Sequence, residues 1–227
     1  MIVLILHGWG HERQYWEQIA HILPRYDQNI KVVALDLPGF GGEKLPSSIR
    51  TIPHYAKWLT DYIKKNKLTD IILIGHSFGG RVAAEYTAKN PKTVKKLILY
   101  AAPCIYRPTD SLKRRIAFYK VFKHVMPHNV RKLFSSADAK AIKNPNLSCV
   151  FRNIVRHDQT SILKSLTVPT LLLWGENDKM VPLRIAQEMH ELISGNAFRV
   201  MPHEGHNAHL DNPTLFAGIV YDYIKNN

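Results

Sequence analysis

The chain has 227 residues, the size of one domain with a large core, and its 45% hydrophobic and 22% charged residues exclude a disordered or fibrous protein. Lysine and arginine total 31 against 18 acidic residues, which gives a net charge of +13 and would suit nucleic acid, a membrane surface or an acidic partner. The segment 104–168 alone holds 13 basic and 3 acidic residues, so a net +10 of this charge belongs to one part of the chain.

The first residues, 1–6, are apolar but lack the basic start of a signal peptide and are too short for its hydrophobic region. No window approaches the run of about 18 apolar residues that a membrane span needs. Cys104 and Cys149 match no metal-ligand spacing, so we expect free thiols in a reducing compartment. These features predict a soluble, cytoplasmic protein without a transmembrane segment.

Short apolar runs alternate with longer stretches of helical period along the chain. This alternation predicts an α/β fold, a mostly parallel six-strand sheet flanked by helices. The predicted strands are 2–6, 31–35, 71–75, 97–101, 170–174 and 197–201.

Three segments carry apolar residues at the spacing of one helix face, and we expect their aromatic residues to belong to the core. The positions are Tyr15, Trp16, Ile19 and Leu23; Tyr55, Trp58, Leu59, Tyr62 and Ile63; and Leu215, Phe216, Ile219, Val220, Tyr223 and Ile224.

The basic segment 104–168 interrupts the alternation between the fourth and fifth predicted strands. Apolar residues recur at helical spacing among its basic residues, from Leu112 to Met126, so we predict a small helical insertion. The expected organisation is a core of residues 1–103 and 169–227 with this insertion at 104–168, which is not an independent domain. Its basic amphipathic stretch could also lie on anionic lipid.

The sequence Gly-His-Ser-Phe-Gly at 75–79 follows an apolar strand and runs into a helix start. A serine in such a strand-to-helix turn is held in a strained conformation above the carboxyl end of the sheet, the arrangement called a nucleophile elbow. Ser77 is therefore the predicted nucleophile.

A serine nucleophile needs a base that is oriented by an acid. Glu176 and Asp178 follow the fifth strand, and His203, His206 and His209 follow the sixth, in the order that the elbow predicts. Residue type does not choose among them. The three histidines sit three residues apart in a loop, whereas a helical metal-ligand pair is four apart, so we expect no metal site there.

The tetrahedral intermediate also needs hydrogen-bond donors for its negative oxygen. The backbone N–H of Phe78, directly after the nucleophile, is one candidate, and the N–H of Trp9 in the loop after the first strand is the second. His7, before a glycine at a strand end, is expected to be a structural hydrogen-bonding residue.

Five motifs follow one another along the chain: His-Gly-Trp-Gly at 7–10, Asp-Leu-Pro-Gly-Phe-Gly at 36–41, Gly-His-Ser-Phe-Gly-Gly at 75–80, Trp-Gly-Glu-Asn-Asp at 174–178 and Glu-Gly-His at 204–206. In these motifs the chain resembles the α/β-hydrolase superfamily of serine carboxylesterases and lipases along essentially its whole length. The resemblance implies that Asp178 is the acid, His206 the base, Asp36 a structural residue, and 104–168 a cap over the active site.

One departure from the family concerns the sheet. The family's sheet normally begins with a hairpin before the His-Gly strand, but here that strand starts at residue 2. Residues 31–35 should then form an edge strand, which a homodimer or a covering segment could protect.

The expected activity is hydrolysis of carboxylic esters through Ser77, His206 and Asp178 by way of an acyl-enzyme, with no cofactor or metal. The same residues would serve a thioesterase, a prolyl aminopeptidase or a C–C bond hydrolase, and a non-catalytic ligand-binding relative is a third hypothesis. The chain looks most like the group of the pimeloyl-carrier-protein methyl ester esterases. The basic segment would then attract an acidic carrier protein or an anionic interface rather than nucleic acid. The alternative is a solvated basic surface with no dedicated partner.

Overall fold

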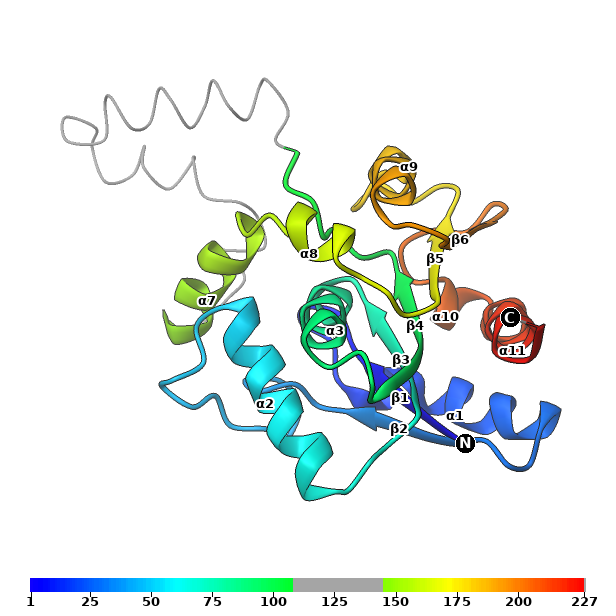
Figure 1. Ribbon diagram of the computed structural model, residues 1–227, viewed down its shortest axis with the longest axis horizontal. Coiled ribbons are helices and arrows are strands. Elements are labelled where there is room, and N and C mark those ends of the chain that lie inside the picture. Colours follow the sequence, from blue (N-terminus) through cyan, green and yellow to red (C-terminus); the bar gives the residue numbers. More distant parts are fainter. Residues whose placement is uncertain (108–144, 227) are drawn as a thin grey trace.

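A computed structural model describes residues 1–107 and 145–226 of the protein (Figure 1). The predicted helix from Leu112 to Met126 lies outside these residues. The described elements are, in chain order, β1 (Ile2–Leu6), η1 (Arg13–Trp16), α1 (Glu17–Tyr26), β2 (Lys31–Leu35), α2 (Ile52–Lys65), β3 (Ile71–His76), α3 (Phe78–Lys89), β4 (Val94–Tyr100), α7 (Pro145–Val155), α8 (Thr160–Lys164), β5 (Thr170–Gly175), α9 (Leu183–Leu192), β6 (Ala197–Met201), α10 (Ala208–Asp211) and α11 (Pro213–Asn226).

The six strands form one sheet in the order β2-β1-β3-β4-β5-β6, and all the pairings are parallel. This confirms the predicted fold class. The predicted bounds of β1, β2 and β6 agree with the structure, whereas β4 begins at Val94 rather than at residue 97. The hydropathy pattern does not indicate this start because positions 95 and 96 are both lysine, although Lys96 is buried.

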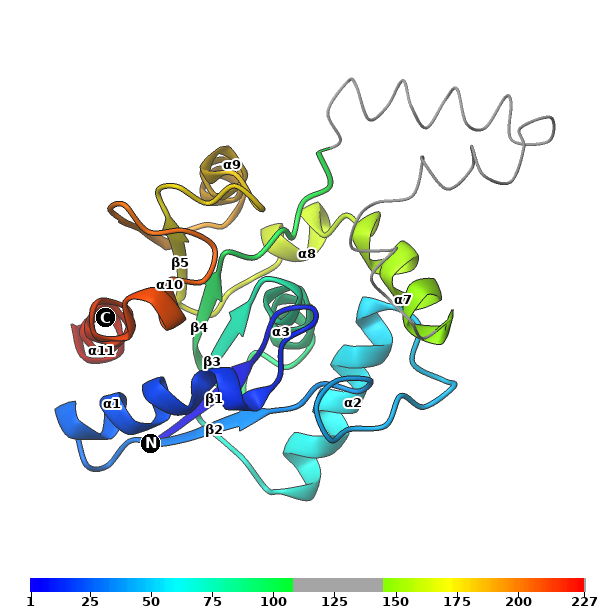
Figure 2. The same ribbon diagram turned by 180° about the vertical axis from the view of Figure 1, so that it is seen from behind.

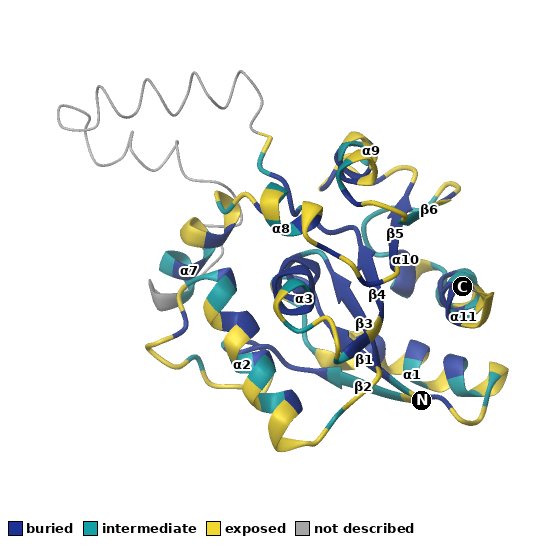
Figure 3. Ribbon diagram, viewed as in Figure 1, coloured by how far each residue is buried: buried dark blue, intermediate teal, exposed yellow. Residues whose placement is uncertain are grey.

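The burial of the strands follows their position in the sheet (Figure 3). β3 and β5 are buried at every residue, as expected for parallel strands covered on both faces, and β2 is only partly buried at the sheet edge. The prediction that residues 31–35 form an edge strand is therefore correct.

The helices cover the two faces of the sheet in two groups. α1, α10 and α11 pack together on one face, and α2, α3, α8 and α9 pack on the other (Figures 1 and 2). Trp16 and Tyr55 are fully buried, as predicted, but Tyr15 is 39% exposed. Both Tyr15 and Trp16 belong to the 3-10 turn η1, and only Trp16 of the two is buried there.

The described part of the segment between β4 and β5 contains α7 and α8. Cys104 is buried and Cys149 half-buried, and both are free thiols, as expected. Among the described residues, no helix has the length and apolar character of a membrane span.

Lys96 fixes the C-terminal helix to the sheet. Its ammonium group, on the buried side of β4, donates to the carbonyl oxygens of Tyr223 (2.9 Å) and Ile224 (2.8 Å) in the last turn of α11. The last carbonyls of a helix have no partner within the helix, and a cation there is favoured by the helix dipole. Burial lowers the pKa of Lys96.

We expect Lys96→Met to lower the free energy of unfolding by about 1–3 kcal/mol, because it leaves two helix-end carbonyls without their donor. Urea denaturation of both proteins measures this. The matched control is Lys95→Met, at the neighbouring exposed position, which should change stability by less than about 0.5 kcal/mol. Equal losses in the two variants would contradict this role of Lys96.

Candidate active site

The turn from β3 into α3 holds Ser77 in a strained backbone conformation, with φ 50° and ψ −113°. Positive φ is uncommon for a residue with a side chain, and it persists only where the surroundings enforce it. Here the Ser77 N–H donates to the Tyr100 carbonyl (2.8 Å), and the Ser77 carbonyl accepts from the Gly80 N–H (3.1 Å). The turn therefore has the backbone geometry of a nucleophile elbow.

Glycines at 75 and 79 are needed for this turn. A methyl group on Gly75 would lie 2.6 Å from the Gly79 carbonyl oxygen, and one on Gly79 would lie 2.6 Å from the His7 carbonyl oxygen. Both distances are shorter than any real contact of a Cβ atom with backbone. The glycines thus let α3 approach both the preceding strand, β3, and the loop after β1.

Asp178 and His206 come together from the loops after β5 and β6. The His206 Nδ1 lies 2.7 Å from one Asp178 carboxylate oxygen, and the other oxygen accepts the N–H groups of Met180 (2.9 Å) and Val181 (2.8 Å). The Asp178 side chain is fully buried and that of His206 is 8% exposed. A carboxylate on Nδ1 fixes the ring orientation and leaves Nε2 free to act on another group.

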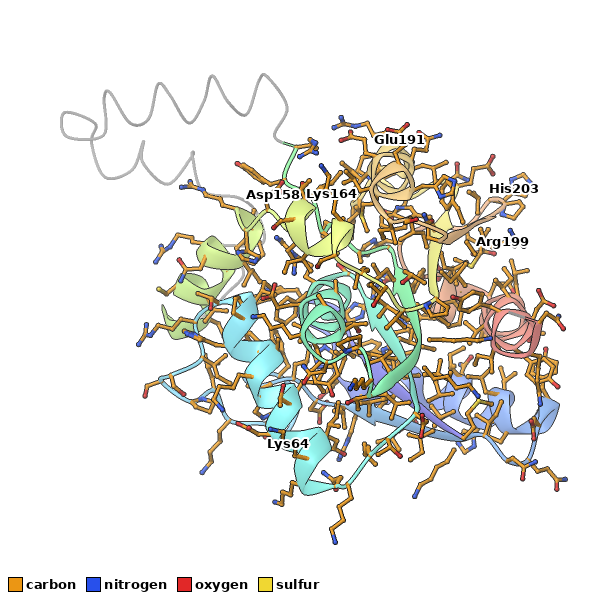
Figure 4. The ribbon with its side chains drawn as sticks, in the orientation of Figure 1. Lys64, Asp158, Lys164, Glu191, Arg199 and His203 are labelled. Carbon is orange, nitrogen blue, oxygen red and sulfur yellow. The ribbon has the colours of Figure 1, made fainter. Side chains whose placement is uncertain are left out.

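The competing acid and base lie elsewhere. Glu176 accepts the N–H of His203 (2.9 Å), and the His203 ring is 93% exposed at the molecular periphery (Figure 4). His209 is fully buried and stacks on Trp16 at 4.1 Å between ring centroids. The structure therefore pairs Asp178 with His206 and separates Glu176, His203 and His209 from that pair.

Two rings hold the backbone of His206. Its carbonyl oxygen accepts hydrogen bonds from the Tyr100 hydroxyl (2.9 Å) and from Nε2 of His76 (3.0 Å). Tyr100 comes from β4 and His76 from β3. The loop that carries His206 is thus tied to the centre of the sheet.

Ser77 and His206 line one pocket of about 180 Å³. This volume is close to that of a cavity that holds benzene, so the pocket has room for a small ring or a short chain. No hydrogen bond joins Ser77 to His206 within the described residues, and the hydrogen bond that His206 makes through Nδ1 goes to Asp178. Apolar side chains in the lining come from several segments, among them Trp9, Phe78, Phe151 and Met180.

Trp9 and Phe78 both line this pocket. Phe78 is the first residue of α3, where backbone N–H groups have no partner within the helix. Neither amide donates a hydrogen bond to backbone within the described residues. Both are therefore free to donate to an oxygen at the pocket.

His7 is a structural residue, as predicted. Its Nε2 accepts the Leu37 N–H (2.9 Å), so the ring proton sits on Nδ1 and donates to the Gly8 carbonyl (2.7 Å). Burial lowers the pKa of His7 to about 4, so the ring is neutral at pH 7. It ties the loop after β1 to the loop after β2.

Asp36 also has a structural position, as the family resemblance implied. Its carboxylate accepts the N–H groups of Arg13 (2.7 Å) and Gly42 (3.3 Å) and pairs with the Arg13 guanidinium at 3.5 Å. These contacts join the loops after β1 and β2 and do not involve the pocket.

Sequence reasoning gave no role to four polar residues of the pocket, His11, His76, Arg81 and Asn207. Arg81 is buried on α3, and its guanidinium donates to the carbonyl of His157. His76 occupies the variable position of the Gly-x-Ser-x-Gly pattern, and His11 follows the Gly-Trp-Gly loop. Only their closeness in the fold distinguishes these residues from ordinary loop and helix residues.

The family comparison agrees with this geometry. A family model described as "Alpha/beta hydrolase family" matches residues 2–219. A relative from Wigglesworthia glossinidia brevipalpis, named pimeloyl-acyl-carrier-protein methyl ester esterase, is 27% identical, and the alignment covers 98% of this chain and 93% of the relative.

Solved structures share the fold at lower identity. An esterase from Exiguobacterium antarcticum has a TM-score of 0.78 at 23% identity, with 100% of this chain and 92% of that chain covered. A mutant of the meta-cleavage product hydrolase CumD has a TM-score of 0.73 at 17% identity and the same coverage. These likenesses establish the architecture.

Proposed function

This chain belongs to the alpha/beta hydrolase family and is esterase-like, and from that premise we propose that it cleaves carboxylic esters through Ser77, His206 and Asp178. The observation that carries the proposal is the 2.7 Å contact between His206 and a fully buried Asp178 carboxylate, at a pocket that also holds Ser77. A buried carboxylate behind a histidine, beside a serine in a strained turn, is the combination that makes a serine nucleophilic.

In the acylation step His206 Nε2 takes the Ser77 proton while Ser77 Oγ attacks the ester carbonyl. The bond to the alcohol oxygen then breaks, and the imidazolium gives its proton to the leaving alcohol. Asp178 stays ionised and stabilises the imidazolium. In deacylation His206 takes a proton from water while the water oxygen attacks the acyl carbonyl. The bond to Ser77 Oγ then breaks, the imidazolium returns its proton to Ser77 Oγ, and the acid is released.

We assign the oxyanion hole to the backbone N–H groups of Trp9 and Phe78. Both amides lack a backbone acceptor within the described residues, and Trp9 and Phe78 line the same pocket as Ser77. Fixed donors of this kind stabilise the negative oxygen of the tetrahedral intermediate, and each contributes about 10²–10³ in rate.

We also assign residues 104–168 to a cap over a hydrolase core made of 1–103 and 169–227. Support comes from α7, whose residues Phe151, Ile154 and Val155 line the pocket. Nine of the 13 basic residues of the segment lie in 108–144, outside the described residues.

We further propose an ester attached to an acidic carrier protein as the substrate class. The relative from Wigglesworthia is named for such a substrate, and the net +10 of residues 104–168 would attract an acidic carrier to the pocket. The pocket itself need only admit the end of the acyl chain that carries the ester.

The acid assignment predicts different results for two neighbouring carboxylates. Asp178→Asn should lower kcat for p-nitrophenyl esters by about 10⁴, because the amide no longer holds the histidine in the required tautomer. Steady-state kinetics over a chain-length series of these esters measures this and reports the acyl length that the pocket accepts. Ser77→Ala should remove turnover.

Glu176→Gln is the control, since Glu176 bonds only to the exposed His203 segment within the described residues. Its kcat should stay within about threefold of the original value. Comparable losses at positions 176 and 178, or turnover that survives Ser77→Ala, would overturn the proposed triad.

The carrier proposal predicts that salt acts on one substrate class only. Between low salt and about 0.5 M NaCl, kcat/KM for a pimeloyl-carrier-protein methyl ester should fall at least tenfold, because screening weakens long-range attraction. For p-nitrophenyl acetate, which is neutral, it should change less than twofold. Equal salt sensitivity of the two substrates would contradict carrier recognition while leaving the esterase proposal intact.

A further inference from the structure

Three histidines from distant parts of the sequence meet beside the active site. His11 lies in the loop after β1, His76 at the end of β3 and His209 in α10. One ring nitrogen from each lies within 4.8 Å of the other two. His76 and His209 are buried, and His11 is half-buried at the wall of the pocket.

Four ring nitrogens of these three histidines have no hydrogen-bond partner within the described residues. They are Nδ1 of His11, Nδ1 of His76 and both nitrogens of His209. Buried polar atoms are normally paired, because an unpaired one costs about 1–3 kcal/mol. Because each neutral ring has one lone-pair nitrogen, the three rings together offer three unpaired nitrogens to a ligand that accepts lone pairs.

His76 has the arrangement of a metal ligand. Its Nε2 lies 3.0 Å from the His206 carbonyl oxygen, which can only accept, so the proton is on Nε2 and the lone pair is on Nδ1. Metal-binding histidines usually donate their second nitrogen to a carbonyl or carboxylate in this way. A side chain at position 8 would crowd this nitrogen, because a Cβ on Gly8 would lie 2.9 Å from it.

The other two rings are held in place by stacking. His209 stacks on Trp16 with 15° between the planes, and His11 stacks on Tyr15 at 4.6 Å. Burial lowers the pKa of His11, His76 and His209, so all three rings are neutral near pH 7. Neutral imidazole is the form that binds metal, and no proton has to leave.

We propose that His11, His76 and His209 form a binding site for a divalent transition-metal ion, with Zn²⁺ as the ion to test. Three imidazoles without a thiol or carboxylate suit this class of ion. Tetrahedral Zn²⁺ with Zn–N bonds of about 2.0–2.1 Å needs nitrogens about 3.3 Å apart. A ring rotation that moves each nitrogen inward by about 1 Å would bring the three nitrogens to this separation. The pocket that His11 lines gives the ion a path of entry.

The site differs from the catalytic residues and from the loop histidines. His203 is exposed and His206 is bonded to Asp178, so neither belongs to it. The proposal does not rest on the esterase activity, since its test measures binding of the ion.

The test is titration of untagged, full-length protein, stripped with a chelator, with Zn²⁺ in competition with a chromophoric chelator. We expect one ion per chain and a higher melting temperature when Zn²⁺ is bound. His209→Phe keeps the stacking on Trp16 and should weaken binding at least about 100-fold. Co²⁺ in place of Zn²⁺ should give the visible absorption of a nitrogen-ligated, four-coordinate ion.

His11→Gln is a second variant at a half-buried loop position, and it decides the matter if His209→Phe does not fold. It should also weaken binding at least about 100-fold. His203→Gln removes an exposed imidazole and should leave binding within threefold. Absence of saturable one-to-one binding, retention of binding in His11→Gln, or an equal loss in His203→Gln would overturn the site.

Discussion

The close backbone packing around Ser77 is the constraint on which the rest of the site depends. Gly75 and Gly79 let α3 lie against β3 and against the loop after β1, and they hold Ser77 at a positive φ. The Gly79 N–H donates to the His7 carbonyl (3.1 Å), so the segment with the nucleophile and the segment with Trp9 are fixed to each other. The proposed nucleophile and both proposed oxyanion donors thus share one rigid unit.

The parallel sheet places the remaining groups around that unit. Asp178 and His206 follow β5 and β6, and because parallel strands end at the same edge, their loops meet where β3 ends. Tyr100 and His76 then tie the His206 backbone to the sheet centre. The catalytic proposal therefore rests on connections between loops as much as on the three side chains.

The fold could be predicted from sequence because its buried strands are uninterrupted apolar runs and its long helices have a clear period. The predicted β4 is too short because Lys96 counts as polar in the hydropathy pattern. The sequence does not show that its ammonium group is buried against the end of α11. Spacing alone did not separate Asp178 from Glu176, because both follow β5 and only the fold shows which one faces His206. The cluster of His11, His76 and His209 was missed because it joins positions up to 198 residues apart.

The central claim, that the turn after β3 presents Ser77 as a nucleophile activated by His206, is tested most directly by a fluorophosphonate, which reacts preferentially with activated serines. Intact mass and peptide mapping should show one label per chain, on Ser77, and His206→Ala should slow labelling at least about 100-fold. A label on another residue, or an unchanged labelling rate in His206→Ala, would contradict the account.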